Sequence, residues 1–253
     1  MGRARLPDHL LVLCYHGVSR DWPQPWAVTP DALEAQVRVL LSRGWTGTTF
    51  IDGLDHLPGA RCFAITFDDA YRSVVELGLP ILQRLGVPAT VFVPTDFADR
   101  AALMDFGTLG RWLGTEWEEE LRCMSWAELR LLREAGWEIG SHTRSHRHLS
   151  TLDDDEITRE LSTSKARCEE ELDVSAVTLA YPFSDRDWRV VEAARAVGYV
   201  AAAADDAELE DSPDIYEWPR VSVYRTDSLP KFRLRTSPAA RDFRQRLQRL
   251  RAT

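Results

Sequence analysis

Long apolar runs are absent from this 253-residue sequence, which limits where the chain can act. No stretch of about eighteen or more apolar residues occurs, so the sequence predicts no membrane-spanning helix. Near the N-terminus, Arg3 and Arg5 precede the apolar run Leu10–Cys14, which is too short for a secretory signal core and lacks a small-residue cleavage site. We interpret this run as a first strand and expect a cytoplasmic protein.

Cysteine is also scarce. The four cysteines, Cys14, Cys62, Cys123 and Cys168, are widely spread and include no Cys-x-x-Cys pair. Without an export signal, this pattern argues against a disulfide framework, and free, buried thiols are expected. Cys14 lies two residues before His16, but the alternation of side chains along a strand favours core packing over a role as a nucleophile.

Positive charge is scarce over most of the chain. Residues 1–230 contain 23 lysines and arginines against 39 aspartates and glutamates, a net charge of −16 that argues against nucleic acid as a partner. Residues 231–253 carry eight basic residues and one aspartate, with Phe243, Leu247 and Leu250 at the spacing of an amphipathic helix. Two interpretations of this tail stay open. It contacts an anionic membrane peripherally, or it docks on the acidic body or is disordered. We favour the second interpretation.

The first stretch that carries chemistry is Ala64–Tyr71. An apolar run rich in branched and aromatic residues predicts a buried strand, and Asp68 and Asp69 follow at its C-terminal end, where α/β folds place their chemistry. Consecutive side chains on a strand point in opposite directions, so the two carboxylates share a site only if the backbone turns there. Two interpretations of this dipeptide are open. One carboxylate binds a metal while its neighbour accepts a proton, or both carboxylates are solvated and cap the next helix.

The second stretch, Gly140–His146, follows a short predicted strand, Trp137–Gly140, and contains His142 and His146. Their spacing predicts that both imidazoles lie on one face of a helical turn. Two histidines and one carboxylate form a zinc-type ligand set, and three protein ligands leave a position open for water. Combined with the paired aspartates at another strand end, the stretch predicts a catalytic metal site.

These two stretches resemble the first two motifs of a known family. Thr66–Asp69 and Ser141–His146 are similar to the motifs of the polysaccharide deacetylases, also called carbohydrate esterase family 4 or the NodB homology domain. The resemblance extends from about Leu11 to Val223. It implies a distorted (β/α) barrel that uses a divalent metal, usually Zn²⁺ but also Co²⁺, Mn²⁺ or Ni²⁺, to hydrolyse N-acetyl groups of N-acetylglucosamine-type sugars.

Motif position in this resemblance implies roles for individual residues. Asp69, His142 and His146 are the implied metal ligands, and Asp68 is the implied general base. His148 follows two residues after His146 but is not part of the motif. A fourth protein ligand there would displace the water that the reaction needs.

No histidine occurs after His148, and this absence bears on the general acid. Many members of the family carry that acid on a late Leu-x-His motif, which this chain lacks. A subgroup resembling the bacterial poly-N-acetylglucosamine deacetylases begins instead with a Tyr-His-x-Val-like strand whose histidine fills the role. Tyr15–Val18 is similar to that strand, so the resemblance implies that His16 is the general acid.

A third stretch is similar to a motif in which a backbone N–H just after a proline helps to form the oxyanion hole. Tyr181, Pro182 and Phe183 match this pattern, with Phe183 at the N–H position, whereas Ser184 replaces the usual glycine. An arginine that orients the catalytic aspartate in other members is missing from this motif. Arg220, near the end of the last predicted strand, either points at the site in its place or lies at the surface.

The remaining sequence alternates predicted strands and helices, which indicates an α/β protein with a parallel sheet or barrel. Length and composition fit one catalytic domain, residues 1–230, followed by the basic tail, residues 231–253. Caps and apolar stripes predict helices that start near Thr29, Tyr71, Ser125, Thr151 and Asp187.

Residues 96–124 interrupt this alternation. The segment follows a strand, so it should lie on the face that carries the site. It forms either a lid or subsite wall, with Trp112 or Trp117 against a sugar ring, or a surface helix with aromatic packing. Trp22 and Trp26, in a loop after the first strand, either stack on a sugar or cover the barrel.

The resemblance therefore implies a metal-dependent hydrolase that removes N-acetyl groups from a poly-, oligo- or lipid-linked saccharide. One alternative is a deacylase of the same fold that acts on another acyl ester or amide. A second is an inactive carbohydrate-binding homologue, which the missing arginine suggests. A third is a membrane-surface assembly protein in which the basic tail is the functional part.

Overall fold

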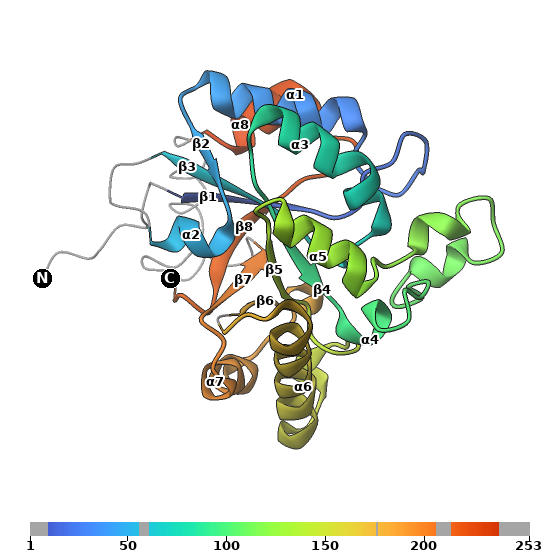
Figure 1. Cartoon of the computed structure of the whole chain (residues 1–253), viewed down its shortest axis with the longest axis vertical. Coiled ribbons are helices and arrows are strands. Elements are labelled where there is room, and N and C mark those ends of the chain that lie inside the picture. The colour runs from blue at the N-terminus through green and yellow to red at the C-terminus, as the bar shows by residue number, and fades with distance from the viewer. Residues whose placement is uncertain (1–9, 56–60, 176, 206–213, 238–253) are drawn as a thin grey trace, which may run out of the picture.

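The structure is a computed structural model that describes residues 10–55, 61–175, 177–205 and 214–237. Within these ranges the strands form one parallel sheet that curls into a barrel with helices packed around it (Figure 1). The strands are β1 (Leu10–Tyr15), β2 (Thr46–Thr48), β3 (Cys62–Phe67), β4 (Thr90–Val93), β5 (Glu138–Ser141), β6 (Thr178–Ala180), β7 (Ala201–Asp205) and β8 (Trp218–Ser222). Their order in the sheet is β1-β8-β7-β6-β5-β4-β3-β2, with a further pairing of β1 and β3.

Strand β3 shows how the barrel closes and why it is distorted. One edge of β3 pairs with β1 over the full length of both strands, from Leu10 opposite Cys62 to Tyr15 opposite Phe67. The other edge is shared, because β2 pairs with the first half of β3 and β4 with the second half. Seven strands therefore form the closed ring and β2 lies beside β3, which confirms the predicted distorted (β/α) barrel.

Helices cover the outside of the barrel and mostly begin where the sequence predicts caps (Figure 1). They are α1 (Pro30–Ser42), α2 (Phe50–Leu54), α3 (Leu79–Leu85), α4 (Thr95–Ala98), α5 (Trp126–Glu134), α6 (Asp154–Leu172), α7 (Trp188–Val197) and α8 (Leu229–Arg235). The Thr29 side chain caps α1, and Ser125 and Asp153 form capping boxes at the starts of α5 and α6. The predicted helix near Tyr71 differs, because a π-helical turn, Val74–Gly78, precedes α3.

One end of the barrel is closed by apolar side chains. Small residues such as Ala64 and Ala203 keep the barrel interior narrow. Phe50 of α2 packs edge-on against Phe92 of β4, with the ring centroids 6.2 Å apart. The Phe50 N–H donates a hydrogen bond to Thr90 Oγ1 at the beginning of β4, so this aromatic pair closes the end where the strands start. The functional side chains are at the opposite end.

The predicted boundary between residues 1–230 and residues 231–253 falls inside a helix. Helix α8 crosses it, buries Phe232 and packs against α1 (Figure 1). The amphipathic stripe predicted from Phe243 onward lies outside the described residues. No helix in the described part of the chain has the length and apolar character needed to cross a bilayer.

Candidate active site

The carboxyl ends of the strands surround a cavity of about 450 Å³ at the open end of the barrel. All the residues predicted to act as metal ligands, base or acid line this cavity. Its polar lining includes His16 after β1, Asp68 and Asp69 after β3, His142 and His146 after β5, Asp205 at the end of β7, and Arg220 in β8.

The backbone turns sharply after β3 and brings two neighbouring carboxylates into this cavity. Asp69 and Ala70 both adopt left-handed backbone angles, with φ of 68° and 55°. A continued strand would have pointed Asp68 and Asp69 in opposite directions. The turn meets the condition that the sequence set for a shared site. Left-handed non-glycine residues cost roughly 1–3 kcal/mol each, and such strain is typical of functional sites.

The two predicted histidine ligands lie on a loop, so the predicted helical turn is wrong. Strand β5 ends at Ser141, and Thr143 and His146 have left-handed φ values of 65° and 59°, which interrupt any helix. The loop is held locally, because the Thr143 N–H donates to Ser141 Oγ and the His146 N–H donates to Thr143 Oγ1. Two left-handed residues, and not helical periodicity, bring His142 and His146 together.

Glu160 of α6 stabilises this loop through hydrogen bonds. Its buried carboxylate accepts hydrogen bonds from the backbone N–H groups of Arg144 and Ser145, at 3.1 and 2.9 Å, and from the Ser145 hydroxyl at 2.6 Å. Three donors compensate the burial of this carboxylate. Sequence analysis did not identify Glu160, because it lies in a long charged helix where most acidic residues are solvated.

Asp69, His142 and His146 form a ligand cluster that fits a divalent metal. Asp69 Oδ1 lies 3.4 Å from His142 Nε2 and 3.1 Å from His146 Nε2. Tetrahedral zinc with bonds of about 2.0–2.2 Å places its nitrogen and oxygen ligands about 3.3 Å apart. The His142 Nδ1–H donates to the Ala180 carbonyl at 2.8 Å, which leaves Nε2 with a free lone pair toward Asp69.

The surroundings of the cluster support this fit. Buried Asp69 Oδ1 accepts no hydrogen bond from the described residues, although both imidazoles face it. A cation between Asp69 Oδ1 and the two Nε2 atoms would satisfy all three atoms. The donor set of oxygen and nitrogen suits Zn²⁺ and the neighbouring divalent transition metals.

Arg220 of β8 lies in the site and pairs with Asp68. Its guanidinium donates to both oxygens of that carboxylate, at 2.7 and 2.8 Å, and contacts Thr66 Oγ1 and Asp205 Oδ1 at 3.2 Å each. Both partners are buried, which decides between the two locations left open for Arg220. Burial opposes ionisation of Asp68, but the charges of Arg220 and His142 outweigh it and hold the pKa of Asp68 at about 2.

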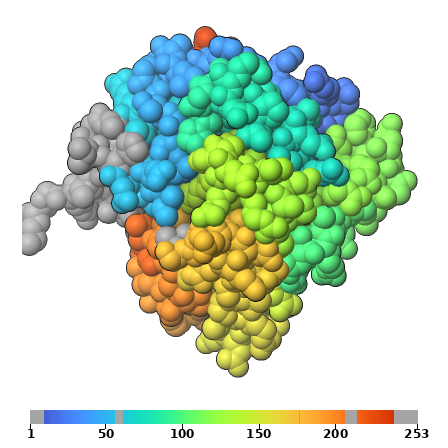
Figure 2. All heavy atoms as spheres, in the orientation of Figure 1, coloured from blue at the N-terminus to red at the C-terminus, as the bar shows by residue number. Residues whose placement is uncertain are grey.

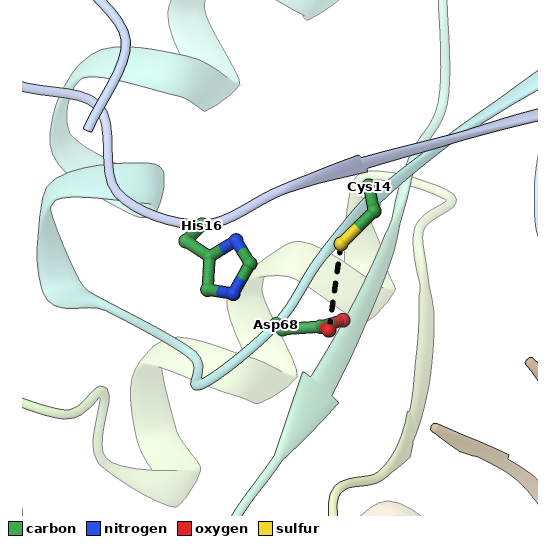
Figure 3. Close-up of side chains that lie close together, drawn as sticks. All are labelled: Cys14, His16 and Asp68. Carbon is green, nitrogen blue, oxygen red and sulfur yellow. Dashed lines mark hydrogen bonds between the residues drawn. The ribbon is translucent and has the colours of Figure 1, made fainter. Parts of the chain in front are cut away.

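Cys14 and His16 lie near Asp68 (Figure 3). The Cys14 thiol donates a weak hydrogen bond to Asp68 Oδ2 at 3.5 Å, and ligand atoms of the three residues lie within 4.8 Å of one another. Burial raises the pKa of the Cys14 thiol well above its ordinary value, which argues against a thiolate nucleophile. All four cysteines are free and buried, as predicted.

The predicted oxyanion stretch forms a tight turn beside the ligand cluster. Phe183 and Ser184 both have a left-handed φ of 57°, which explains why the pattern favours glycine at the position of Ser184. The Ser184 hydroxyl accepts a hydrogen bond from the Asp205 N–H at 2.6 Å. Pro182 is buried and does not line the cavity. Tyr181 lines it, and its hydroxyl donates to the Tyr216 carbonyl.

With this geometry established, comparison with known proteins decides the family. The sequence model of the polysaccharide deacetylase family matches residues 56–202, more than half of the chain. The chain belongs to the polysaccharide deacetylase family. His16 and Arg220 lie outside the matched range.

Individual proteins agree with the polysaccharide deacetylase assignment. YxkH of Bacillus subtilis (strain 168), whose name places it among polysaccharide deacetylases, is 24% identical over 201 residues, which cover 76% of this chain and 63% of YxkH. The deacetylase PplD of Streptococcus pyogenes in complex with acetate superposes with a TM-score of 0.74 at 17% identity, over 92% of this chain and all of PplD. A de-N-acetylase from Aggregatibacter actinomycetemcomitans gives 0.71 at 16% identity, over 88% and 98% of the two chains. The two structures share the barrel fold.

In this member of the polysaccharide deacetylase family, one wall of the cavity comes from residues 96–124, which project from the side of the barrel (Figures 1 and 2). Phe106 stacks on His146 with ring centroids 3.7 Å apart. Trp112 and Trp117 do not line the cavity; both pack against the apolar core. The predicted wall is present, but the expectation that a tryptophan provides its aromatic ring is wrong.

Two further aromatic contacts complete the cavity wall. Phe183 meets His146 edge-on at 4.7 Å and stacks on His148 at 4.0 Å. His148 is more than half exposed and is not in the ligand cluster, as expected from the motif. Trp26 lines the cavity beside His16, with ring centroids 6.0 Å apart, whereas Trp22 is buried in the core.

Proposed function

We propose that this polysaccharide deacetylase is a metal-dependent hydrolase that removes acetyl groups from N-acetylglucosamine-type units of a saccharide. The observation that carries the proposal is that a set of metal-type ligands and a buried ion pair lie next to each other. Asp69, His142 and His146 form a metal-type ligand set, and the Asp68–Arg220 pair lies beside it, with Asp68 Oδ2 only 4.0 Å from His142 Nε2. A Lewis acid beside a proton acceptor can catalyse the hydrolysis of an amide.

Asp69, His142 and His146 would hold the ion, preferably Zn²⁺. When bound, the ion supplies Lewis acidity toward the acetyl carbonyl and toward water. All three ligand residues are buried, which strengthens the electrostatic interactions among them. His142 is kept in one tautomer by the Ala180 carbonyl, which fixes the nitrogen that it presents.

Asp68 is proposed to accept the proton of the attacking water. Its pKa of about 2 keeps the carboxylate charged at neutral pH, and the two hydrogen bonds from Arg220 fix its orientation. Arg220 therefore takes the positioning role of the arginine that the third motif lacks. The low basicity of Asp68 is tolerable because the Lewis acid makes the attacking water more acidic.

His16 is proposed to act on the leaving nitrogen of the scissile bond, and Phe183 on its carbonyl oxygen. Protonated His16 donates its proton to the leaving nitrogen, and the backbone N–H of Phe183 stabilises the developing oxyanion. The neighbouring N–H groups of Ser184 and Asp185 already donate to the carbonyls of Tyr181 and Pro182. The products are acetate and an amino sugar.

The cavity supports a saccharide as substrate. Aromatic residues, including Trp26, Phe106, Phe183 and Tyr224, surround a charged floor, an arrangement that suits the apolar faces and hydroxyl groups of a sugar ring. The acetate complex of the related streptococcal deacetylase supports acetyl transfer to water as the reaction. The inactive-homologue alternative loses its motivation, because Arg220 pairs with Asp68.

Release of acetate from N-acetylglucosamine oligomers tests this function. Metal-free protein should be inactive, and one equivalent of zinc should restore acetate release. The His16→Ala variant should release no acetate even with zinc. Matched O-acetyl ester substrates, assayed in parallel, identify the preferred acyl bond. Stoichiometric zinc binding with no acetate from any N-acetyl saccharide would refute the proposed substrate.

A further inference from the structure

A second group of metal-type ligands lies beside the proposed catalytic cluster. Cys14, His16 and Asp68 have ligand atoms within 4.8 Å of one another, and Figure 3 shows the three side chains directed toward a common point. Sulfur is the feature that separates this group from the oxygen and nitrogen ligands of Asp69, His142 and His146. The proposed mechanism leaves the thiol of Cys14 unused.

The distances match those of a thiolate-containing site. Cys14 Sγ lies 3.5 Å from Asp68 Oδ2. Tetrahedral zinc with a sulfur bond of about 2.3 Å and an oxygen bond of about 2.0 Å requires a separation of about 3.5 Å between these two ligands. His16 Nδ1 is buried and has no hydrogen-bond partner among the described residues, so no hydrogen bond holds this nitrogen away from a cation.

We propose that Cys14, His16 and Asp68 form a second site, which binds a thiophilic divalent cation such as Cd²⁺ or excess Zn²⁺. Soft cations are selected because thiolate is their preferred ligand. On binding, the Cys14 S–H bond breaks, its proton passes to solvent, and an Sγ–metal bond forms without any change of oxidation state. The guanidinium of Arg220 stabilises the resulting thiolate.

Charge determines the order in which the two sites fill. Arg220 contacts both oxygens of Asp68, so its positive charge opposes a cation at the second site. The thiol is also buried and neutral, and its deprotonation costs free energy. Asp69, His142 and His146 lack both obstacles. The first equivalent of metal therefore occupies that cluster, and the second site fills only at higher metal concentration.

Occupancy of the second site inhibits the reaction, a consequence that rests on the proposed function. A cation on Asp68 removes the proposed base, and the same cation on His16 removes the proposed acid. The enzyme is then activated by one equivalent of metal and inhibited by more. Cys14 makes this inhibition selective for thiophilic metals, so Cd²⁺ inhibits at lower concentration than Mn²⁺.

Titration of metal-free protein with Cd²⁺ tests the site without reference to activity. The first cluster contains no sulfur, so thiolate-to-cadmium absorption in the near ultraviolet reports the second site alone. The proposal predicts that this absorption rises with the second equivalent and not the first, with release of one thiol proton. Cys14→Ser should lose the absorption, whereas Cys62→Ala, a buried thiol on the neighbouring strand, should keep it.

Acetate release at increasing metal concentration tests the consequence, with each protein normalised to its own activity at one equivalent. Wild type and Cys62→Ala should lose at least about tenfold in rate with excess Cd²⁺, and Cys14→Ser should resist. Absence of the wild-type absorption, or its persistence in Cys14→Ser, would overturn the second site. Absorption in a protein that releases no acetate would refute the deacetylase function and leave the second site intact.

Discussion

Arg220 and Asp68 form a buried, two-point ion pair although 152 residues separate them in the sequence. Arg220 comes from the last strand of the barrel and Asp68 from the end of the third, and the strands that close the ring bring them together. The pair orients the proposed base toward the ligand cluster of Asp69, His142 and His146, and keeps this base ionised. It links the stability of the barrel to the chemistry of the site.

Removal of Arg220 alone should be strongly destabilising. Arg220→Met leaves the Asp68 carboxylate buried without its cation, and loss of one partner of a buried pair costs about 3–5 kcal/mol. Urea unfolding measures the loss. The double variant Asp68→Asn with Arg220→Met should be more stable than Arg220→Met, because no unpaired charge remains. Equal stability of wild type and Arg220→Met would show that the pair is not formed.

Asp68 should contribute a pH-dependent part of the free energy of unfolding. The pKa of its carboxyl falls from an ordinary 3.8 to about 2 in the folded protein. The stabilisation is complete above pH 4 and is lost as the pH falls from about 4 to about 2, because the unfolded chain takes up the proton first. Its size is of the order of 2 kcal/mol.

Urea unfolding at a series of pH values between 2 and 5 measures this contribution. Asp68→Asn should flatten the fall in unfolding free energy over that window. Asp31→Asn, a change at an exposed aspartate in α1, should leave the fall unchanged. Parallel curves for wild type and Asp68→Asn would contradict the depressed pKa.

Glu160 should control metal affinity without contacting the metal. Glu160→Ala removes three hydrogen bonds that hold Arg144 and Ser145 in the histidine loop. Loss of such supporting contacts typically lowers metal affinity about 10–100-fold. Competition with a chromophoric chelator gives the zinc affinity. Glu170→Ala, an exposed change in the same helix, is the control, and equal affinities for the two variants would contradict this role.

Phe106 should contribute to saccharide binding. It is the ring of the 96–124 segment that reaches the cavity, so Phe106→Ala should raise KM several-fold, as expected for loss of about 1 kcal/mol of aromatic contact. Trp117→Ala, a change outside the cavity, should leave KM within about twofold. Because Phe106 also stacks on His146, the zinc affinity of both variants must be compared. An unchanged KM for Phe106→Ala would exclude it from the substrate subsite.

Much of the barrel and most of the site could be predicted from the sequence. An apolar run located the Asp68–Asp69 strand end, and the four-residue spacing pointed to His142 and His146. The resemblance then implied their roles and added His16. The helical turn predicted for the two histidines failed for a physical reason. A spacing of four residues brings side chains together in a helix, but left-handed residues such as Thr143 achieve the same result in a loop.

Long-range pairing and the choice among aromatics could not be read from the sequence. Arg220 fits a surface position as well as the site until the barrel register places it opposite Val12 and Asp205. The sequence does not favour Phe106 over Trp112 or Trp117, because residue type says nothing about which side of a segment faces the cavity. The proximity of Arg220 and Phe106 to the site becomes known only from the folded barrel.

The most direct test of the proposed mechanism compares Asp68→Asn with Asp69→Asn, for both zinc binding and acetate release from N-acetylglucosamine oligomers. Asp68→Asn should still bind one zinc ion and should lose about 10²–10⁴-fold in rate, the contribution typical of a general base. Asp69→Asn should lose the zinc itself. Full activity in Asp68→Asn, or equal loss of zinc in both variants, would contradict the division of roles between the two neighbouring carboxylates.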